Sequence, residues 1–280
     1  MPELPEVETM RRGIDPIVGS VVEGITVPKC KYRPIEILPA ARTFRRRVIG
    51  RTITAIDRLG KRVLIRLNNA HIIVFEPRMT GLLLLADPPD RDHLRFAIHL
   101  SGAISELWFW DRRGLGSVRC LSERQLAQRL GPEKVGPDAL SISGSELKER
   151  LGTSRRAVKV ALLDQRAVAG IGNLYASEIL HLARIHPEKL CCRLSTRAWD
   201  AIETATHEVL SQAIRYEGST LDDGTYRNAL NQDGSYQNHH RVYNRQDQQC
   251  PRCHRKTIRR IVQAQRSTFF CSGCQRKAGA

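Results

Sequence analysis

The sequence has no apolar run long enough to cross a bilayer. Its longest candidate, near Gly81–Ala86, falls far short of the ~20 residues that a membrane helix needs. The first residues lack the basic and then apolar pattern of a secretory signal peptide. Acidic residues are also scarce, with 29 Asp and Glu against 45 Lys and Arg, so the formal charge is +16. These absences predict a soluble, cytosolic protein whose partner is a polyanion such as nucleic acid or an anionic membrane.

The length of 280 residues is sufficient for two domains and a small appendage. Short strand-like runs fill the first part of the chain, and the clearest is Leu94–Leu100, where apolar and other residues alternate. With turn signals between the runs, the pattern predicts antiparallel hairpins in a β-sandwich or barrel. The expected strands are Val21–Val27, Arg51–Asp57, Arg62–Leu67, His71–Phe75, Leu82–Leu85, Leu94–Leu100 and Ile104–Trp110.

A change of pattern follows the Gly/Pro-rich linker at Gly131–Asp138. Helices are expected from Ser145, over Arg155–Gln165, over Leu174–Arg184 and over Ala198–Arg215. The Leu174–Arg184 helix is apolar on several faces, so it should be central to its domain. The polar stretch Glu217–Gln249 is expected to be a long, mobile loop with a function. We therefore predict three parts, at residues 1–135, 136–245 and 246–280.

The chain start carries an unusual combination of groups. If Met1 is removed, the new end is the secondary amine of Pro2, which can attack an aldehyde-like carbon and form an iminium ion. Glu3 would lie beside this amine as a proton carrier, and Glu6 returns to the same side of a helical turn. The alternative interpretation is an ordinary helix start with acids suited to its dipole.

Four of the eight cysteines form two Cys-x-x-Cys pairs near the chain end. Cys250 and Cys253 precede, and Cys271 and Cys274 follow, 17 residues that include two strand-like runs. Four thiolates complete a tetrahedral coordination sphere, so the pattern predicts one structural Zn²⁺, with a redox dithiol as the alternative. The remaining cysteines have no ligand spacing and are expected to be ordinary thiols: Cys30, Cys120, Cys191 and Cys192.

A second nucleic-acid signal is the sequence Gly170-Ile171-Gly172-Asn173, immediately before the Leu174 helix. Glycines allow close approach of the backbone, and the amides at a helix start can bind a phosphate oxygen. A tight turn capped by Asn173 explains the same residues, and the two interpretations are compatible.

Three motifs together resemble bacterial formamidopyrimidine-DNA glycosylases of the Fpg/Nei family, in their order and spacing over nearly the whole chain. They are Pro2–Glu8, Gly170–Glu178 and Ala264–Cys271. The start is similar to the Fpg branch and not to the endonuclease VIII branch, which typically opens Pro-Glu-Gly-Pro-Glu. The resemblance implies a two-domain α+β protein: a β-sandwich with an N-terminal helix, a helix-two-turns-helix DNA-binding domain and a four-cysteine zinc finger.

The resemblance also implies roles for individual residues. Pro2 would be the nucleophile and Glu3 the general acid/base, with Glu6 in support, and Lys61 would reach the DNA backbone at the lesion. The remaining residues are implied to contact DNA: Met79, His93, Arg113, Leu115, Lys159, Asn173, Tyr243 and Arg266. The family gathers the extruded base in the loop that corresponds to Glu217–Gln249.

The chain departs from the family pattern at a residue inserted into the duplex. Where the family commonly has Asp-Pro-Arg-Arg-Phe-Gly, this sequence reads Asp111-Arg112-Arg113-Gly114-Leu115-Gly116. Leu115 therefore replaces an aromatic wedge and loses a stacking face worth ~1–3 kcal/mol per base. Lesion search or opposite-base preference is expected to differ as a result.

The expected activity is bifunctional. The enzyme would excise oxidised purines such as 8-oxoguanine and formamidopyrimidines through a Schiff base at Pro2, and then cleave the strand by β,δ-elimination. It would act as a monomer on damaged double-stranded DNA in the bacterial cytosol, near the nucleoid. Two alternatives remain: a zinc-finger DNA-binding protein without catalysis, and an endonuclease VIII-like glycosylase for pyrimidine lesions.

Overall fold

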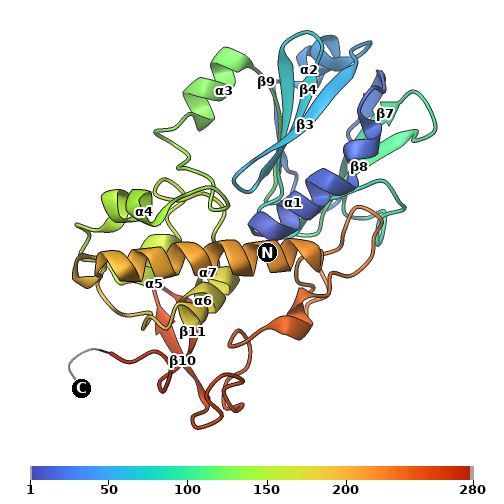
Figure 1. Ribbon diagram of the computed structural model, residues 1–280. Coiled ribbons are helices and arrows are strands. Elements are labelled where there is room, and N and C mark those ends of the chain that lie inside the picture. The colour runs from blue at the N-terminus through green and yellow to red at the C-terminus, as the bar shows by residue number, and fades with distance from the viewer. Residues whose placement is uncertain (1, 278–280) are drawn as a thin grey trace. The chain divides into compact units, whose positions relative to one another are not determined.

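The computed structural model describes residues 2–277, and these fall into two compact units (Figure 1). The first unit comprises Met1–Gly131 and Ile214–Gln237, and the second comprises Pro132–Ala213 and Asn238–Ala280. The division into three parts at residues 135 and 245 stays a prediction. Within the described residues, no helix is sufficiently long and apolar to traverse a bilayer.

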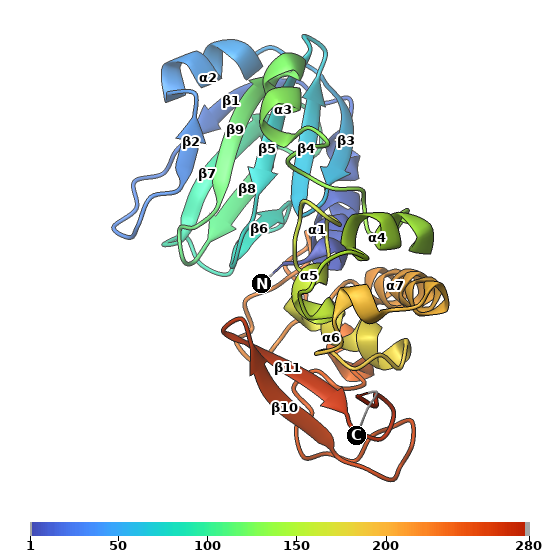
Figure 2. The same cartoon turned by 90° about the vertical axis from the view of Figure 1, so that its left-hand side faces the viewer.

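Two β-sheets form the first unit (Figure 2). One sheet has the strand order β2-β9-β5-β4-β3 and the other has β1-β7-β8-β6. All strand pairs are antiparallel except β2 with β9, which is parallel. The strands are β1 (Val22–Thr26), β2 (Glu36–Leu38), β3 (Ile53–Leu59), β4 (Arg62–Leu67), β5 (His71–Glu76), β6 (Gly81–Leu84), β7 (Leu94–Leu100), β8 (Glu106–Asp111) and β9 (Ser117–Ser122).

The predicted strands are confirmed, but the sequence did not reveal β2 and β9. The first has only three residues, and the second mixes polar and apolar residues without a clear period. Both faces of β7 are largely buried, and Arg95 itself is only 2 % exposed. Its guanidinium is held by the backbone carbonyls of Asp111 and Arg112.

Helix α1 (Leu4–Gly13) packs on strands β3, β4 and β6. Val7, Met10 and Ile14 recur at helical spacing, and all three are fully buried. The short 3-10 helix η1 (Asp15–Ile17) follows, and two further helices were not predicted because they are short and carry few apolar residues. These are α2 (Ala41–Val48) and α3 (Glu123–Leu130).

The chain returns to the first unit at Ile214, near the end of helix α7 (Thr196–Arg215), and residues 217–235 contain no regular helix or strand, as the loop prediction required. This segment is nevertheless anchored in the core, because Tyr226 and Ala229 are 3 % and 1 % exposed. The Ala229 carbonyl accepts a hydrogen bond from the N–H of Leu85 at 2.8 Å. A Cβ on Gly13 would lie 2.5 Å from the Ala229 side chain, so only glycine permits this approach.

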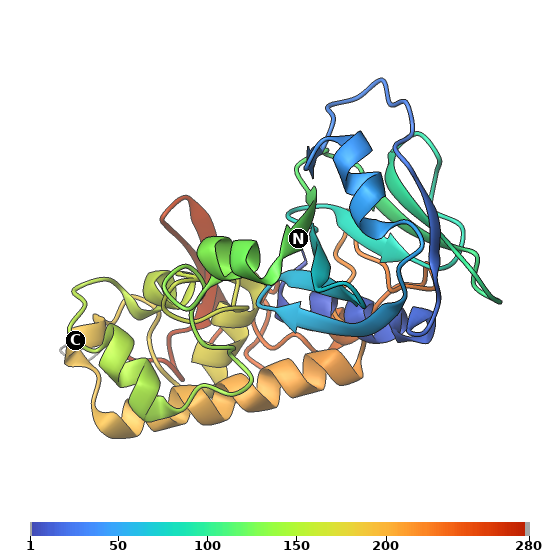
Figure 3. The ribbon, with the colours of Figure 1, turned by 90° about the horizontal axis from the view of Figure 1, so that it is seen from above.

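The second unit consists of helices and a terminal hairpin. Helix α6 is buried at every residue from Leu174 to His181, which confirms its predicted central position. Helix α5 is shorter than the predicted Arg155–Gln165, and α7 is one uninterrupted helix whose last two residues belong to the first unit (Figure 3). The elements are α4 (Gly144–Leu151), α5 (Val158–Leu162), α6 (Asn173–Leu182), η2 (Cys191–Arg193), α7 (Thr196–Arg215), η3 (Tyr236–His239), β10 (Ile258–Gln263) and β11 (Arg266–Cys271).

Candidate functional site

The chain start is fixed by a capping box at the first turn of α1. The N–H of Glu3 donates to Oε2 of Glu6 at 2.8 Å, and the Glu3 carboxylate accepts from the N–H of Glu6. The two acids are 3 % and 2 % exposed, and Pro2 is buried as well. Two backbone N–H groups that have no acceptor within the helix thereby gain one. These hydrogen bonds hold both carboxylates in place beside Pro2.

Glu6 also binds the distant segment that closes the first unit. Its Oε1 accepts a hydrogen bond of 2.9 Å from the N–H of Ser219. Gly218 precedes this contact with a φ of +79°, and a Cβ there would lie 2.9 Å from the Glu6 side chain. Glycine is therefore required for the close approach. Glu6 connects the start of α1 with residues 217–237, a contact that the sequence did not reveal.

Lys61 lies in the two-residue turn between β3 and β4, where Leu59 pairs with Arg62. The Nη1 of Arg58 donates to the carbonyl of Gly60 at 3.1 Å, and its Nε donates to Glu8 Oε2 at 2.9 Å. Although burial raises the pKa of Glu8, its hydrogen bonds with Arg12 and Arg58 lower the pKa below the ordinary value overall. An ionised Glu8 on α1 thus holds the turn that carries Lys61.

The turns that carry Met79 and Arg113 are joined by buried polar groups. The Thr80 hydroxyl donates to Oδ1 of Asp111, which is fully buried. The N–H of Arg113 donates to Thr80 Oγ1 at 3.0 Å, and the N–H of Gly116 donates to Asp111 Oδ2 at 2.8 Å. The structure therefore brings these two predicted DNA-contacting turns together.

The side chains on these turns differ in exposure. Met79 is 36 % exposed and Arg113 is exposed, whereas Leu115 is half-buried. Gly114 between them has a φ of +59°. A Cβ at this position would come within 2.2 Å of the Arg33 carbonyl oxygen, so the tight loop depends on glycine.

His93 lies against aromatic rings in the first unit. Its ring stacks on Tyr32 with centroids 4.6 Å apart, and its edge meets Trp110. The Nδ1 atom lies 2.8 Å from Oδ1 of Asp90. Burial raises the pKa of Asp90, but hydrogen bonds from His93 outweigh it and lower the pKa below its ordinary value. The carboxylate therefore orients the imidazole at this position.

In the second unit, Lys159 and Asn173 are brought together with the terminal hairpin. Lys159 is 1 % exposed. Its ammonium donates to Asn173 Oδ1 at 2.6 Å, to the Ser267 carbonyl at 3.2 Å and to Thr268 Oγ1 at 2.8 Å. The Asn173 amide also donates to the Ser267 carbonyl, at 3.0 Å. Lys159 thus braces the start of α6 against β11, next to the exposed Arg266.

A buried carboxylate positions the segment that carries Tyr243. Glu178 is 0 % exposed and accepts from the N–H groups of Arg241, Val242 and Tyr243 at 2.8 to 2.9 Å. The Tyr243 ring then packs edge-on against Phe269 of β11. The sequence did not single out Glu178, although it is the one acid in α6.

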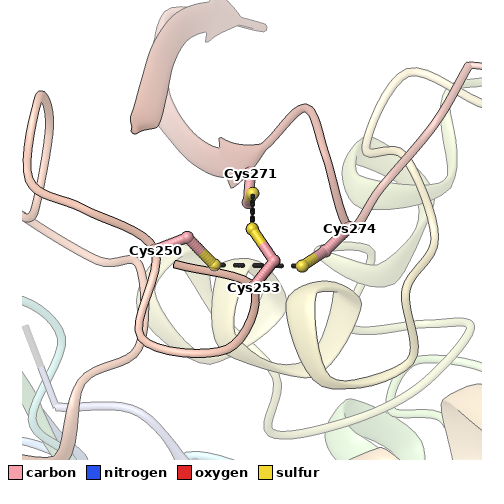
Figure 4. Close-up of side chains that lie close together, drawn as sticks. All are labelled: Cys250, Cys253, Cys271 and Cys274. Carbon is pink, nitrogen blue, oxygen red and sulfur yellow. Dashed lines mark hydrogen bonds between the residues drawn. The ribbon is translucent and has the colours of Figure 1, made fainter. Parts of the chain in front are cut away.

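The four predicted cysteine ligands form one cluster (Figure 4). Their sulfur atoms all lie within 4.8 Å of one another, with Cys250 Sγ 3.8 Å from Cys274 Sγ and Cys253 Sγ 3.7 Å from Cys271 Sγ. Tetrahedral sulfurs at a Zn–S distance of about 2.3 Å are separated by about 3.8 Å, so the donor set fits this ion. Hydrogen bonds from the backbone N–H groups of Arg255 and Lys256 lower the pKa of Cys253 to about 6, which favours its thiolate.

The chain matches two family models. Residues 1–118 match the formamidopyrimidine-DNA glycosylase N-terminal domain, and residues 130–225 match the formamidopyrimidine-DNA glycosylase H2TH domain. Among named relatives, the formamidopyrimidine-DNA glycosylase of Chloroflexus aurantiacus is 39 % identical, with 98 % of each chain covered. That of Bacillus subtilis is 35 % identical, with 99 % of this chain and 100 % of the relative covered.

Solved structures are similar over the same extent. A variant of the Lactococcus lactis protein in complex with DNA that contains Fapy-dG has a TM-score of 0.87 at 32 % identity, with 99 % of this chain and 100 % of that chain covered. The MutM (Fpg) protein of Thermus thermophilus has a TM-score of 0.84 at 34 % identity, with 98 % of each chain covered.

Proposed function

The chain belongs to the formamidopyrimidine-DNA glycosylase family and is a DNA glycosylase for oxidised purines, and we propose that it acts through the amine of Pro2. The observation that carries this proposal is the buried start of α1. There the capping box holds Glu3 and Glu6 beside Pro2 without any lysine in the motif.

The reaction begins when the damaged nucleotide leaves the base stack, at a cost of a few kcal/mol. The Pro2 nitrogen donates its lone pair to C1′ as the bond from C1′ to the base breaks, and the departing base takes up a proton. The attacking amine then loses its proton, and its lone pair expels O4′ from C1′, so that O4′ takes up a proton as the sugar ring opens. The product is an iminium ion between Pro2 and the opened deoxyribose, with Glu3 as proton carrier.

Strand cleavage follows from the same cation. Its positive nitrogen acidifies the C2′ proton, whose removal expels the 3′ phosphate by β-elimination. A second, δ-elimination expels the 5′ phosphate and leaves a one-nucleotide gap. Glu6 acts indirectly, because its two oxygens connect the Glu3 backbone with Ser219. Lys61 contacts the DNA backbone beside the lesion.

We assign the remaining predicted residues to DNA binding. Met79, Arg113 and Leu115 fill the space of the extruded base, and His93 lies along the bound strand. In the second unit, Asn173, Tyr243 and Arg266 contact phosphates, whereas Lys159 acts through Asn173 because protein oxygens surround its ammonium. One chain acts on one lesion, as a monomer in the bacterial cytosol.

We also propose that the cysteine cluster holds one Zn²⁺. With four sulfur ligands the ion would be coordinatively saturated, so it would supply rigidity to the hairpin and no reactive water. Cys250, Cys253, Cys271 and Cys274 would bind it, and the small apolar cluster around Val242, Ile258 and Phe269 packs beside them.

A substrate panel tests the activity. Duplexes that contain 8-oxoguanine opposite cytosine are expected to be nicked to a one-nucleotide gap with phosphate on both ends, and undamaged duplexes are expected to remain intact. Denaturing gels resolve these products. Faster cleavage of an oxidised pyrimidine would overturn the purine preference, and binding without cleavage would favour the non-catalytic alternative.

The contact from Arg58 to the Lys61 turn gives a second prediction. Arg58→Met removes the donor to the Gly60 carbonyl and should lower the single-turnover excision rate about tenfold, with little change in duplex affinity, because the turn loses its position. Arg11→Met is the matched control, since Arg11 also binds Glu8 but not Gly60.

A double variant distinguishes positioning from general destabilisation. In a Lys61→Ala background, Arg58→Met should lower the single-turnover excision rate by less than about twofold, because the residue through which Arg58 acts has been removed. An equal loss in both backgrounds would show that Arg58 acts elsewhere.

A further inference from the structure

Helix α2 presents a strongly basic face in the first unit. Phe44 and Val48, one turn apart, are fully buried and attach the helix to the core. Arg42, Arg45 and Arg46 are exposed on the other side, and the helix contains no acidic residue. We call these three arginines the α2 patch.

Arg42 is unfavourable for the helix that carries it, whereas Arg45 and Arg46 lie in the last turn, where the helix dipole favours a cation. Arg42 occupies the first turn, where the helix dipole disfavours a cation, and the N-cap residue Ala40 provides no side-chain hydrogen bond. Arg42 and Arg46 are also like charges at i and i+4, which repel each other. A helix that breaks several local rules in this way indicates a functional requirement.

No acidic side chain compensates this charge. Within residues 2–277, none of the patch arginines forms an ion pair, and the only side-chain hydrogen bond among them is that of Arg45 to the Ile25 carbonyl at 3.5 Å. Arg47 differs, because it turns inward and donates to the Cys120 carbonyl at 2.8 Å. The patch is therefore directed to solvent and available to an anion.

The location of α2 separates this patch from the catalytic start. Within the first unit, α2 packs against β1, β2 and β9, at the end of the sheets away from the N-terminus (Figure 2). Its large apolar residues, Phe44 and Val48, are already buried in the core, so the helix has no large apolar face to insert into a membrane. Three exposed arginines favour a polyanion that is bound through its charge and not its sequence. Guanidinium groups bind phosphates well.

We propose that the α2 patch binds the phosphate backbone of a second duplex DNA segment, distinct from the duplex that is repaired. This goes beyond the proposed catalytic function. It gives the protein a way to hold two DNA segments at once and to move from one to the other without complete dissociation.

The test uses Arg42→Gln, Arg45→Gln and Arg46→Gln in one full-length protein. Each protein is first saturated with a short unlabelled duplex that contains a tetrahydrofuran abasic analogue, and a labelled undamaged duplex is then titrated in by fluorescence anisotropy. Wild-type protein should bind the second duplex with a salt dependence that reflects about three phosphate contacts. The variant should bind the second duplex much more weakly. The slope of the logarithm of its association constant against the logarithm of salt concentration should be smaller by about 2 to 3.

The matched control neutralises three exposed arginines on other helices, Arg124, Arg129 and Arg150, for the same change in net charge. The control should bind the second duplex as wild type does, and both variants should nick a lesion duplex at the wild-type single-turnover rate. The proposal would be overturned if the patch and control variants lost affinity for the second duplex equally, or if neither lost it. Binding of heparin without binding of duplex would also overturn it. If the triple variant does not fold, Arg46→Gln alone should reduce the slope by about 1. Failure of the catalytic proposal would appear separately, as absence of nicking in all proteins.

Discussion

A protein in which an added leading residue makes Pro2 internal is expected to give no covalent adduct with lesion DNA under borohydride. Borohydride reduces the iminium ion to a stable amine, so trapping reports the attacking nitrogen. An internal proline has an amide nitrogen, whose lone pair is not nucleophilic. The excision rate should therefore fall about a thousandfold or more, which corresponds to a loss of about 4 kcal/mol of transition-state stabilisation. Gel shift of the adduct and mass spectrometry of the chain start provide the two measurements.

Pro5→Ala is the matched control for this experiment. Pro5 is a second buried proline, in the first turn of α1, and its replacement leaves the amine of Pro2 intact. This protein should be trapped normally. Pro2→Gly should be trapped poorly, because it replaces the secondary amine with a primary one. Normal trapping of the extended chain would refute the assignment of the nucleophile.

Loss of one of the four clustered cysteines is expected to have the second largest effect. Wild-type protein should contain about one zinc per chain, and Cys271→Ala should contain almost none, since three thiolates leave the site incomplete. An isolated two-stranded hairpin is marginally stable in water, so without metal β10 and β11 should lose their order. Duplex affinity should then fall about a hundredfold, because Ser267 and Thr268 no longer hold Lys159 and Asn173.

Cys192→Ser is the control for this prediction, since Cys192 is exposed and lies outside the cysteine cluster. It should keep both zinc and affinity. Metal analysis by mass spectrometry and anisotropy with a lesion duplex measure the two quantities. Full zinc content in Cys271→Ala, or unchanged affinity without zinc, would contradict the proposed role of the cluster.

Local features of the fold were predictable from the sequence. The capping box at Glu3 and Glu6 depends on residues three positions apart, and each cysteine pair is equally local. Helix α6 was evident because apolar residues occupy several of its faces. Short elements such as β2 and α2 were missed, since three to eight residues with few apolar positions leave no measurable period.

Contacts between distant parts of the chain were not predictable. Glu6 and Ser219 are 213 positions apart, and their hydrogen bond uses a backbone N–H, which every residue other than proline possesses. Glu178 likewise binds backbone N–H groups of residues 241–243. The family resemblance indicated Lys159 as a phosphate contact, but only the packed structure shows that protein oxygens surround its ammonium.

The two attachments of residues 217–237 have an evolutionary consequence. Ser219 is bonded to Glu6, and Tyr226 and Ala229 are embedded in the core, so both ends of the stretch between them are fixed. On the proposal that this loop holds the extruded base, substitutions within residues 220–225 would alter which damaged base is accommodated without displacing Pro2. We would then expect lineages that meet different oxidants to diversify in this short interval, while the proposed chemistry at Pro2 is inherited unchanged.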